Sequence, residues 1–130
     1  PIIIGDHVYG VDSYGELRGL DAKTGRRLWM SPDMTAQARW STAFLVQHRD
    51  RYFVNNDDGF LMLAQFTPNG YVELSRTRLI EPTSTSGNRT PHGRIAERIV
   101  NWSHPAYANG HVVHRNDREI IRASLRASDY

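Results

Sequence analysis

The stretch that decides the fold is Gly5-Asp6-His7-Val8-Tyr9-Gly10-Val11-Asp12, because a related stretch follows it in the chain. The second copy is Arg49-Asp50-Arg51-Tyr52-Phe53-Val54-Asn55-Asn56, displaced by 44 residues. In both copies an apolar run of β-branched and aromatic residues ends at Asp or Asn. Such residues suit a pleated, half-buried strand, and the Asp or Asn marks a turn. The pair therefore predicts a repeated unit built from short strands.

The repeat extends beyond this stretch and occurs a third time. Gly15-Glu16-Leu17 aligns with Gly59-Phe60-Leu61 at the same displacement. A third copy, Asn109-Gly110-His111-Val112-Val113, begins 60 residues after the second and places Ile121 on Leu61. A repeat of roughly 40–50 residues, each with about four strands, is typical of β-propeller blades.

Apolar runs separated by Gly, Asn, Asp and Pro define the expected strands. We expect them near residues 1–5, 7–12, 16–21 and 26–30, then 43–47, 51–56, 60–66 and 71–76, then 105–108, 111–115 and 119–125. The fold class is therefore predicted as all-β: a partial β-propeller of about three four-stranded antiparallel blades. The blades span about 1–31, 40–76 and 102–125 of one segment, 1–130, and the last is incomplete.

A segment rich in Ser, Thr and Pro separates the second and third copies. Residues 77–101 are predicted to be a long loop, in which Ile95–Val100 fits either a short strand or a turn of helix. Closure of a propeller typically needs four to eight blades. We therefore expect the chain to be the C-terminal portion of a longer propeller, whose remaining blades, or a second copy of the chain, cover the open ends.

Composition excludes several classes of protein. The 130 residues are 39% hydrophobic and 23% charged, which is typical of a globular chain. Cysteine is absent, so disulfides and thiolate metal sites are excluded. No apolar run is long enough to span a membrane. Lys23 is the one lysine among 16 basic residues, and the basic residues form no cluster, so we expect no nucleic-acid partner.

The end of the first repeat resembles a known blade signature. Leu20-Asp21-Ala22-Lys23-Thr24-Gly25-Arg26-Arg27-Leu28-Trp29 is similar to the signature of the quinoprotein alcohol dehydrogenase-like, or PQQ-like, β-propeller repeats, with Asp21, Gly25 and Trp29 matching. The Asp carboxylate can accept from N–H groups of the turn that follows. The glycine permits a positive φ, and the tryptophan offers a flat surface for docking between blades.

The later copies keep little of that signature but resemble the end of exported bacterial PQQ-like propeller proteins. The residues that carry this resemblance lie in four segments, 38–46, 50–53, 102–110 and 115–119. The resemblance implies a periplasmic or otherwise exported protein. It also implies that pyrroloquinoline quinone and calcium are possible in the parent protein, although no residue here matches the family's catalytic Asp or its quinone-stacking Trp.

Acidic and histidine residues are the candidates for metal-binding and catalytic groups in this sequence. The run Asn55-Asn56-Asp57-Asp58-Gly59 is the densest candidate for calcium, but Asp58-Gly59 also reads as a hairpin turn, which we favour. The histidines show no spacing expected of a tight zinc site. His111 and His114 should point to opposite faces of one strand. We therefore assign no catalytic and no metal-binding residue.

Surface residues offer the remaining candidates for a binding role. His104 could line a central channel or hydrogen-bond a turn, and Trp29, Trp40 and Trp102 are expected to pack at blade junctions. Trp40, Trp102 and Tyr107 could instead form stacking platforms for a carbohydrate. The residues expected to be buried are Tyr9, Val11, Leu17, Phe53, Leu61, Leu63, Val113 and Ile121.

These features favour one function and leave one main alternative. The favoured function is a non-catalytic propeller segment that acts as a scaffold, or as a surface binding a protein or carbohydrate, in an exported bacterial protein. The alternative is a fragment of a pyrroloquinoline-quinone-dependent dehydrogenase whose active site lies in other blades. Whether the chain is part of an enzyme stays open at this point, because fold alone does not decide function.

Overall fold

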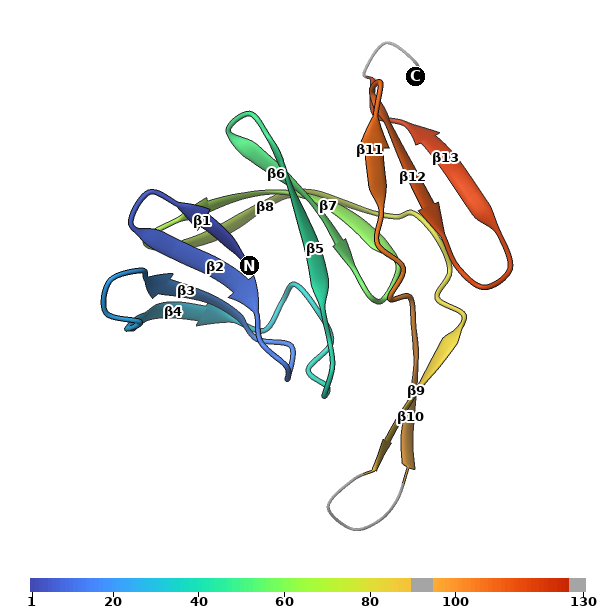
Figure 1. Cartoon of the computed structure of the whole chain (residues 1–130), viewed down its shortest axis with the longest axis horizontal. Coiled ribbons are helices and arrows are strands. Elements are labelled where there is room, and N and C mark those ends of the chain that lie inside the picture. The colour runs from blue at the N-terminus through green and yellow to red at the C-terminus, as the bar shows by residue number, and fades with distance from the viewer. Residues whose placement is uncertain (90–94, 127–130) are drawn as a thin grey trace.

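The chain is all-β in a computed structural model that describes residues 1–89 and 95–126, with side chains up to Gly87 and from Arg98 onward. Four antiparallel sheets of two to four strands make up this part of the chain, as Figure 1 shows. No helix that could cross a membrane occurs within it. The all-β prediction is therefore confirmed.

Three of the sheets correspond to the three sequence repeats and follow simple chain order. The first sheet contains β1 (Ile2–Ile4), β2 (His7–Val11), β3 (Leu17–Asp21) and β4 (Arg27–Ser31). The second contains β5 (Ala43–His48), β6 (Arg51–Asn56), β7 (Phe60–Thr67) and β8 (Gly70–Arg78). The third contains β11 (Ala106–Ala108), β12 (His111–Arg115) and β13 (Ile120–Ser124). The strands predicted for each repeat are present, within a few residues at their ends.

The prediction of a long loop at 77–101 is wrong. The segment contains β9 (Ser84–Arg89) and β10 (Ile95–Val100), which pair as an antiparallel hairpin with Ser86 opposite Arg98. Ile95–Val100, left open between strand and helix, is therefore a strand. Serine and glycine in β9 carry little strand propensity, so the pairing with β10, which composition does not reveal, determines the conformation. In Figure 1 this hairpin projects away from the three larger sheets.

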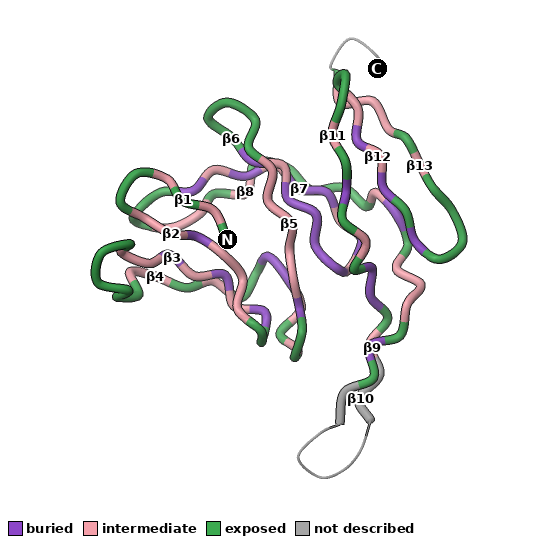
Figure 2. Tube along the Cα trace, in the orientation of Figure 1, coloured by how far each residue is buried: buried purple, intermediate pink, exposed green. Residues whose placement is uncertain are grey.

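The main hydrophobic core lies between the first and second sheets. Tyr9 and Leu17 on the first sheet pack with Tyr52, Val54, Met62, Ala64 and Phe66 on the second. The rings of Tyr9 and Phe66 stack with their centroids 5.5 Å apart. Met34, from the chain between the two sheets, is fully buried among them. Figure 2 shows buried residues following β6 and β7 through this junction.

Five of the eight residues expected to be buried are only half-buried. Tyr9, Leu17 and Leu61 are buried as predicted, whereas Val11, Phe53, Leu63, Val113 and Ile121 are partly exposed. Phe53, Leu63 and Ile121 border an open groove between the second and third sheets. The second junction is thus less tightly closed than the first.

The repeat alignment of Ile121 on Leu61 is also corrected by the strand register. In the third sheet, Ile121 lies opposite His114. The residue of the second sheet that corresponds to His114 is Val54, and Val54 lies opposite Met62, not Leu61. The turn before β13 is shorter: Asn116 N–H donates to Glu119 O, whereas in the first repeat Asp12 N–H donates to Glu16 O. Losing one residue moves each following side chain to the other face of the sheet.

The connections between sheets repeat one geometry. The chain leaving the first sheet passes over the turn between β2 and β3, where Trp40 N–H donates to Ser13 O at 2.7 Å. The chain leaving the second sheet passes over the turn between β6 and β7, where Asn101 N–H donates to Asp57 O, also at 2.7 Å. The hairpin β9–β10 is inserted into the second connection only.

Candidate binding surface

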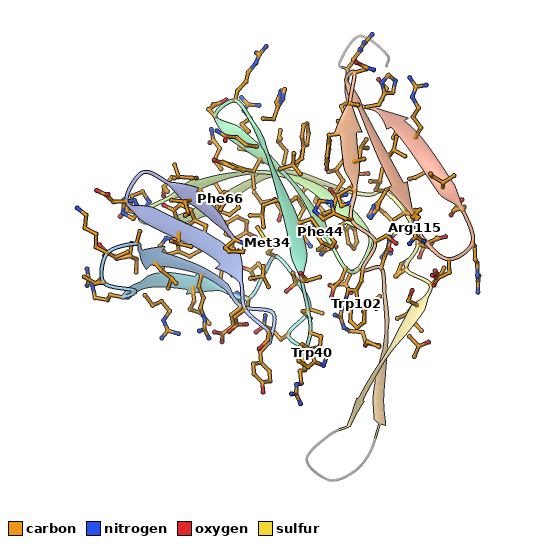
Figure 3. All side chains as sticks on the ribbon, in the orientation of Figure 1. Met34, Trp40, Phe44, Phe66, Trp102 and Arg115 are labelled. Carbon is orange, nitrogen blue, oxygen red and sulfur yellow. The ribbon has the colours of Figure 1, made fainter. Side chains whose placement is uncertain are left out.

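Trp40 and Trp102 lie at the surface, not at sheet junctions as predicted. Trp40 is 49% exposed and Trp102 is 43% exposed. Each lies where a connection has just crossed the turn of the preceding sheet, so the repeated geometry brings both indoles to the same end of the molecule, as Figure 3 shows. We call Trp40, Trp102 and the exposed His104 the tryptophan end.

The backbone at Trp40 helps hold its indole outward. Trp40 has φ of 66°, a left-handed conformation that is uncommon for a bulky residue and indicates a position fixed by its surroundings. Its N–H is held by Ser13 O, and the guanidinium of Arg39 lies 4.7 Å from the ring centroid. A cation over the ring face favours a defined orientation of the indole.

A partly buried ionic network links the segments that carry the two tryptophans. Arg98, from β10, donates Nη2–H to Asp57 Oδ2 at 2.5 Å and Nη1–H to Asp58 Oδ1 at 2.9 Å. It also donates to Ser41 Oγ at 3.0 Å. Ser41 follows Trp40, and Asp57 O accepts from Asn101, which precedes Trp102. Both segments are therefore linked to Asp57: the Trp40 segment through Ser41 and Arg98, and the Trp102 segment through Asn101.

The network explains the role of the acidic turn. The Asp57 side chain is fully buried, and Asp57 Oδ2 also accepts from Thr42 N–H at 3.1 Å. Burial acts to lower the pKa of Arg98, but hydrogen bonding and attraction from Asp57 outweigh it and raise that pKa. Asp57 and Asp58 thus already have a cationic partner. Among the described residues, no group of three or more His, Cys, Asp or Glu could hold a metal.

His104 is exposed and lies just before β11. Its ring centroid is 4.5 Å from that of Phe44 on β5, and Nδ1 lies 2.8 Å from the carbonyl oxygen of Pro105. The two roles expected for His104, lining a channel or hydrogen-bonding a turn, stay predictions, because this contact is to the carbonyl of the next residue, outside any turn. The described chain does not enclose a channel around it.

His114 is more buried than His111, which lies three residues before it on β12, as expected for residues on opposite faces of a strand. His114 is buried, and Nε2–H donates to Ser103 O at 2.9 Å, because a carbonyl can only accept. Burial lowers the pKa of His114, so the ring is neutral near pH 7. Nδ1 has no hydrogen-bond partner in residues 1–89 and 95–126. His111 instead is partly exposed beside Asn109 O.

Tyr107 is not available as a stacking platform. Its ring stacks on Phe53 with centroids 5.2 Å apart, and its hydroxyl donates to Asn55 Oδ1. Burial raises the pKa of this hydroxyl, in keeping with a ring held between two sheets. Of the three aromatic residues suggested for carbohydrate stacking, the structure leaves Trp40 and Trp102 exposed and uses Tyr107 for packing.

The three residues of the blade signature occupy structural positions. Asp21 Oδ1 accepts from the N–H groups of Lys23 and Thr24, and Gly25 has φ of 70°. Trp29 stacks on Tyr9 at 5.7 Å and donates Nε1–H to Thr67 O of the second sheet at 3.0 Å. Trp29 therefore joins the first sheet to the second, in contrast to the two exposed tryptophans.

The comparison with known proteins gives no relative from which a role could be transferred. The chain matches no protein-family model, and no curated protein matches its sequence. The site must therefore be judged on its geometry. Sequence reasoning identified Trp40, Trp102 and His104 but missed Arg98, because its partners lie about 40 residues away and no local motif links them.

Proposed function

We propose that this chain is a non-catalytic β-propeller-type segment that presents a ligand-binding surface at its tryptophan end. The observation that carries the proposal is the exposure of two indoles, one on each connection between consecutive repeated sheets, beside a partly buried ionic network. Exposed tryptophan is costly in water and is enriched where proteins bind partners. The fixed backbone beneath it limits the entropy lost on binding.

The propeller part of the proposal is supported by the sheet arrangement. Three sheets in chain order, each an antiparallel meander joined to the next by the same type of connection, follow the pattern of blades. The resemblance of Asp21, Gly25 and Trp29 to PQQ-like repeats agrees with this pattern. On the same resemblance we propose an exported bacterial protein, in which further blades or a second copy cover the open sheet faces.

The non-catalytic part is supported by what the reactive side chains do. Asp57 and Asp58 bind Arg98, and His114 is buried and neutral. These groups are therefore committed to structure. The alternative, a segment of a quinone-dependent dehydrogenase, places the chemistry elsewhere. Quinone-dependent alcohol or sugar oxidation by this chain contradicts our proposal. The alternative predicts tight binding of pyrroloquinoline quinone only in a longer parent protein, which a titration with the quinone and calcium, followed by absorbance, tests.

Carbohydrate is the ligand class that we test first, because a flat, partly polar indole offers both stacking area and a hydrogen-bond donor. On a glycan array, the wild-type chain should bind a defined subset, and Trp40→Ala with Trp102→Ala should lose that binding. Trp29→Phe serves as the matched control, since it changes a tryptophan outside the tryptophan end. Silence of the folded wild-type chain on the array, or unchanged binding by the double variant, contradicts a carbohydrate-binding tryptophan end.

A further inference from the structure

The hairpin turns of the three repeated sheets form a second end, opposite the tryptophan end. Successive turns of an antiparallel meander lie at alternate ends of its sheet. The connections that carry Trp40 and Trp102 cross the turns β2–β3 and β6–β7. The other turns of the first two sheets, and the turn β11–β12 of the third, therefore lie at the opposite end. In Figure 1 these turns lie on the side away from the hairpin β9–β10.

This opposite end carries an excess of positive charge. Its turns, the residues that border them and the last residues of β13 include six basic and three acidic residues, whereas the rest of the chain has ten basic and eleven acidic residues. These segments are 4–7, 21–27, 48–51, 67–70, 108–111 and 122–124. All six basic residues are exposed. We call them the basic end: Lys23, Arg26, Arg27, Arg49, Arg51 and Arg122.

The acidic residues of these turns neutralise little of that charge. Asp21 Oδ1 accepts hydrogen bonds from groups of its own turn. Lys23 Nζ lies 3.8 Å from Asp6 Oδ2, and Arg51 Nε lies 3.9 Å from Asp50 Oδ1, in each case between largely exposed side chains. Contacts of this kind are weak in water. The other four basic residues form no ion pair within residues 1–89 and 95–126.

Arginines elsewhere in the structure are paired more closely. Arg18 Nη2 lies 2.6 Å from Asp12 Oδ2, and Arg76 Nη2 lies 2.7 Å from Glu73 Oε2. Arg98 binds its two carboxylates in the ionic network beside the tryptophan end. The unequal pairing leaves the charge of the basic end available to an anion from outside the chain.

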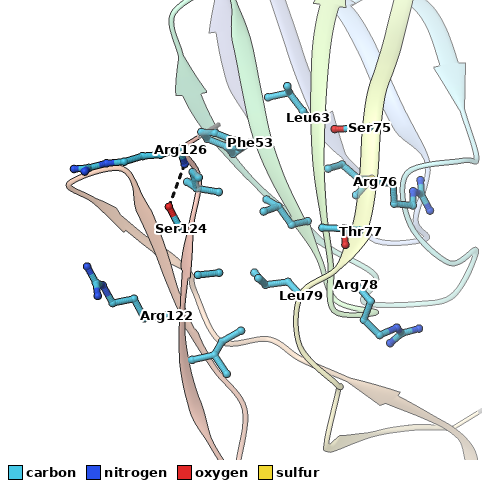
Figure 4. Close-up of a pocket in the computed structure, with 15 residues that line it drawn as sticks. Phe53, Leu63, Ser75, Arg76, Thr77, Arg78, Leu79, Arg122, Ser124 and Arg126 are labelled. Atoms are coloured by element: carbon cyan, nitrogen blue, oxygen red, sulfur yellow. Dashed lines mark hydrogen bonds between the residues drawn. The ribbon is translucent and has the colours of Figure 1, made fainter. Parts of the chain in front are cut away.

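The placement of these charges favours an extended polyanion over a small anion. Five of the six basic residues are arginines, whose planar guanidinium pairs with carboxylate, sulfate or phosphate through two hydrogen bonds. They lie on turns or strand ends of all three repeated sheets, so a long chain can contact several of them in succession. Figure 4 shows Arg122 directed away from Leu63 and Leu79, on the outer side of β13.

The same segments lack the side chains that two other polyanionic partners use. They contain no Trp, Tyr or Phe, and none of the large apolar side chains exposed in the described chain lies in them. Single-stranded nucleic acid is bound largely by stacking on aromatic rings, and membrane surfaces by inserted apolar residues. A polysaccharide with sulfate or carboxylate groups can bind through its charges alone.

We propose that the basic end binds an anionic polysaccharide, whose sulfate or carboxylate groups pair with arginines on the turns of successive sheets. The affinity comes from several ion pairs in water, so it decreases as the salt concentration rises. This site lies on other segments than the tryptophan end and does not depend on the function proposed for that end.

The test uses the 130-residue chain with fluorescein-labelled heparin, a sulfated polysaccharide, and labelled dextran as its neutral counterpart. Fluorescence anisotropy should show saturable binding of heparin and none of dextran. Heparin binding should weaken at least about tenfold between about 50 and about 200 mM salt. Arg27→Glu with Arg49→Glu should also weaken it about tenfold or more, because each change replaces an attraction with a repulsion.

Arg115→Glu with Arg118→Glu is the matched control. It makes the same change in net charge at exposed residues, but these border the turn β12–β13, at the other end of the third sheet. It should weaken heparin binding by about threefold or less, since the charges it alters lie away from the basic end. Comparison of the two pairs separates the position of the charges from the net charge of the chain.

Three results would overturn the proposal. The first is absence of heparin binding to the folded wild-type chain, and the second is equal weakening by the two charge-reversed pairs. The third is tighter binding of duplex DNA than of heparin with the same dependence on Arg27 and Arg49, which would assign the basic end to nucleic acid. Trp40→Ala with Trp102→Ala should bind heparin as the wild type does, and its failure to do so would assign heparin binding to the tryptophan end instead.

Discussion

At the scale of single residues, two glycines let the connections pass close over the turns of the preceding sheet. Gly59 has φ of 84°, and a Cβ added there would lie 1.9 Å from Ile80 O. Gly15, at the corresponding repeat position, has φ of 91° and would place a Cβ 2.2 Å from Ala36 O. Both requirements, a positive φ and a close backbone, leave glycine as the residue that fits.

Substitution of Gly59 should therefore be costly. We expect Gly59→Ala to lower the free energy of unfolding by about 3 kcal/mol or more, since it adds left-handed strain to a backbone clash. Gly25→Ala is the matched control, because Gly25 also has a positive φ, 70°, but meets no atom within 4 Å. It should cost about 1–2 kcal/mol. Urea unfolding measures both, and equal costs would contradict the close approach.

His114 gives the stability a dependence on pH. Burial lowers its pKa in the folded chain below the ordinary 6.5. The unfolded chain therefore binds the proton more readily, so stability is complete above about pH 6.5 and decreases as the pH falls from there toward the lowered value. Asp12, Asp21 and Asp117 also have lowered pKa values, but they act below about pH 3.8, in a separate window.

The variant His114→Gln removes the titrating ring and keeps a side chain that can donate to Ser103 O. Urea midpoints measured between pH 5 and 7.5 should decrease toward acid for the wild type and remain nearly level for the variant. His111→Gln, on the same strand but partly exposed, is the control and should retain the wild-type slope. If His114→Gln left the slope of urea midpoint against pH unchanged, the pH dependence would come from other groups.

At the scale of elements, Arg98 fixes the inserted hairpin to the second sheet. Its guanidinium contacts Asp57, Asp58 and Ser41, and its side chain is 20% exposed while that of Asp57 is fully buried. A buried carboxylate that loses its cationic partner retains its desolvation cost without compensation. The hairpin therefore helps to hold the segment that precedes the second sheet, next to Trp40, through the contact of Arg98 with Ser41.

We expect Arg98→Met to destabilise the chain by about 3–5 kcal/mol. Arg78→Met is the matched control: Arg78 pairs with Glu81 at 3.4 Å, donates to Asp58 O at 3.0 Å and lies 4.4 Å from the Phe60 ring centroid, all in a largely exposed position, so its loss should cost about 1–2 kcal/mol. Chemical denaturation measures the two losses. A cost for Arg98→Met no greater than that for Arg78→Met would show that the network does not stabilise the fold.

Some of these elements could be predicted from the sequence, and others could not. Alternation and turn residues were sufficient to place the strands of the three repeated sheets, because each pairs with its neighbour along the chain. The pairing of β9 with β10 and the contact from Arg98 to Asp57 depend on residues that composition does not connect. The face of Ile121 was assigned wrongly because a turn one residue shorter reverses a strand, which periodicity alone does not detect.

At the scale of the whole molecule, three sheets follow one another with unequal junctions. The first junction is closed by aromatic residues, Trp29 included, whereas the second leaves a groove beside β13. The connections, by contrast, repeat one geometry and expose Trp40 and Trp102 at the same end. The account therefore depends on one central distinction: one tryptophan joins two sheets, and two are displayed to solvent.

Acrylamide quenching of three single-tryptophan variants tests this distinction most directly. Each variant keeps one of Trp29, Trp40 and Trp102 and replaces the other two by phenylalanine. We predict efficient quenching when Trp40 or Trp102 is the one retained and clear protection when Trp29 is retained, with all three becoming alike in urea. Equal protection of the three in the folded chain, or protection of Trp40 and Trp102 greater than that of Trp29, would contradict the account.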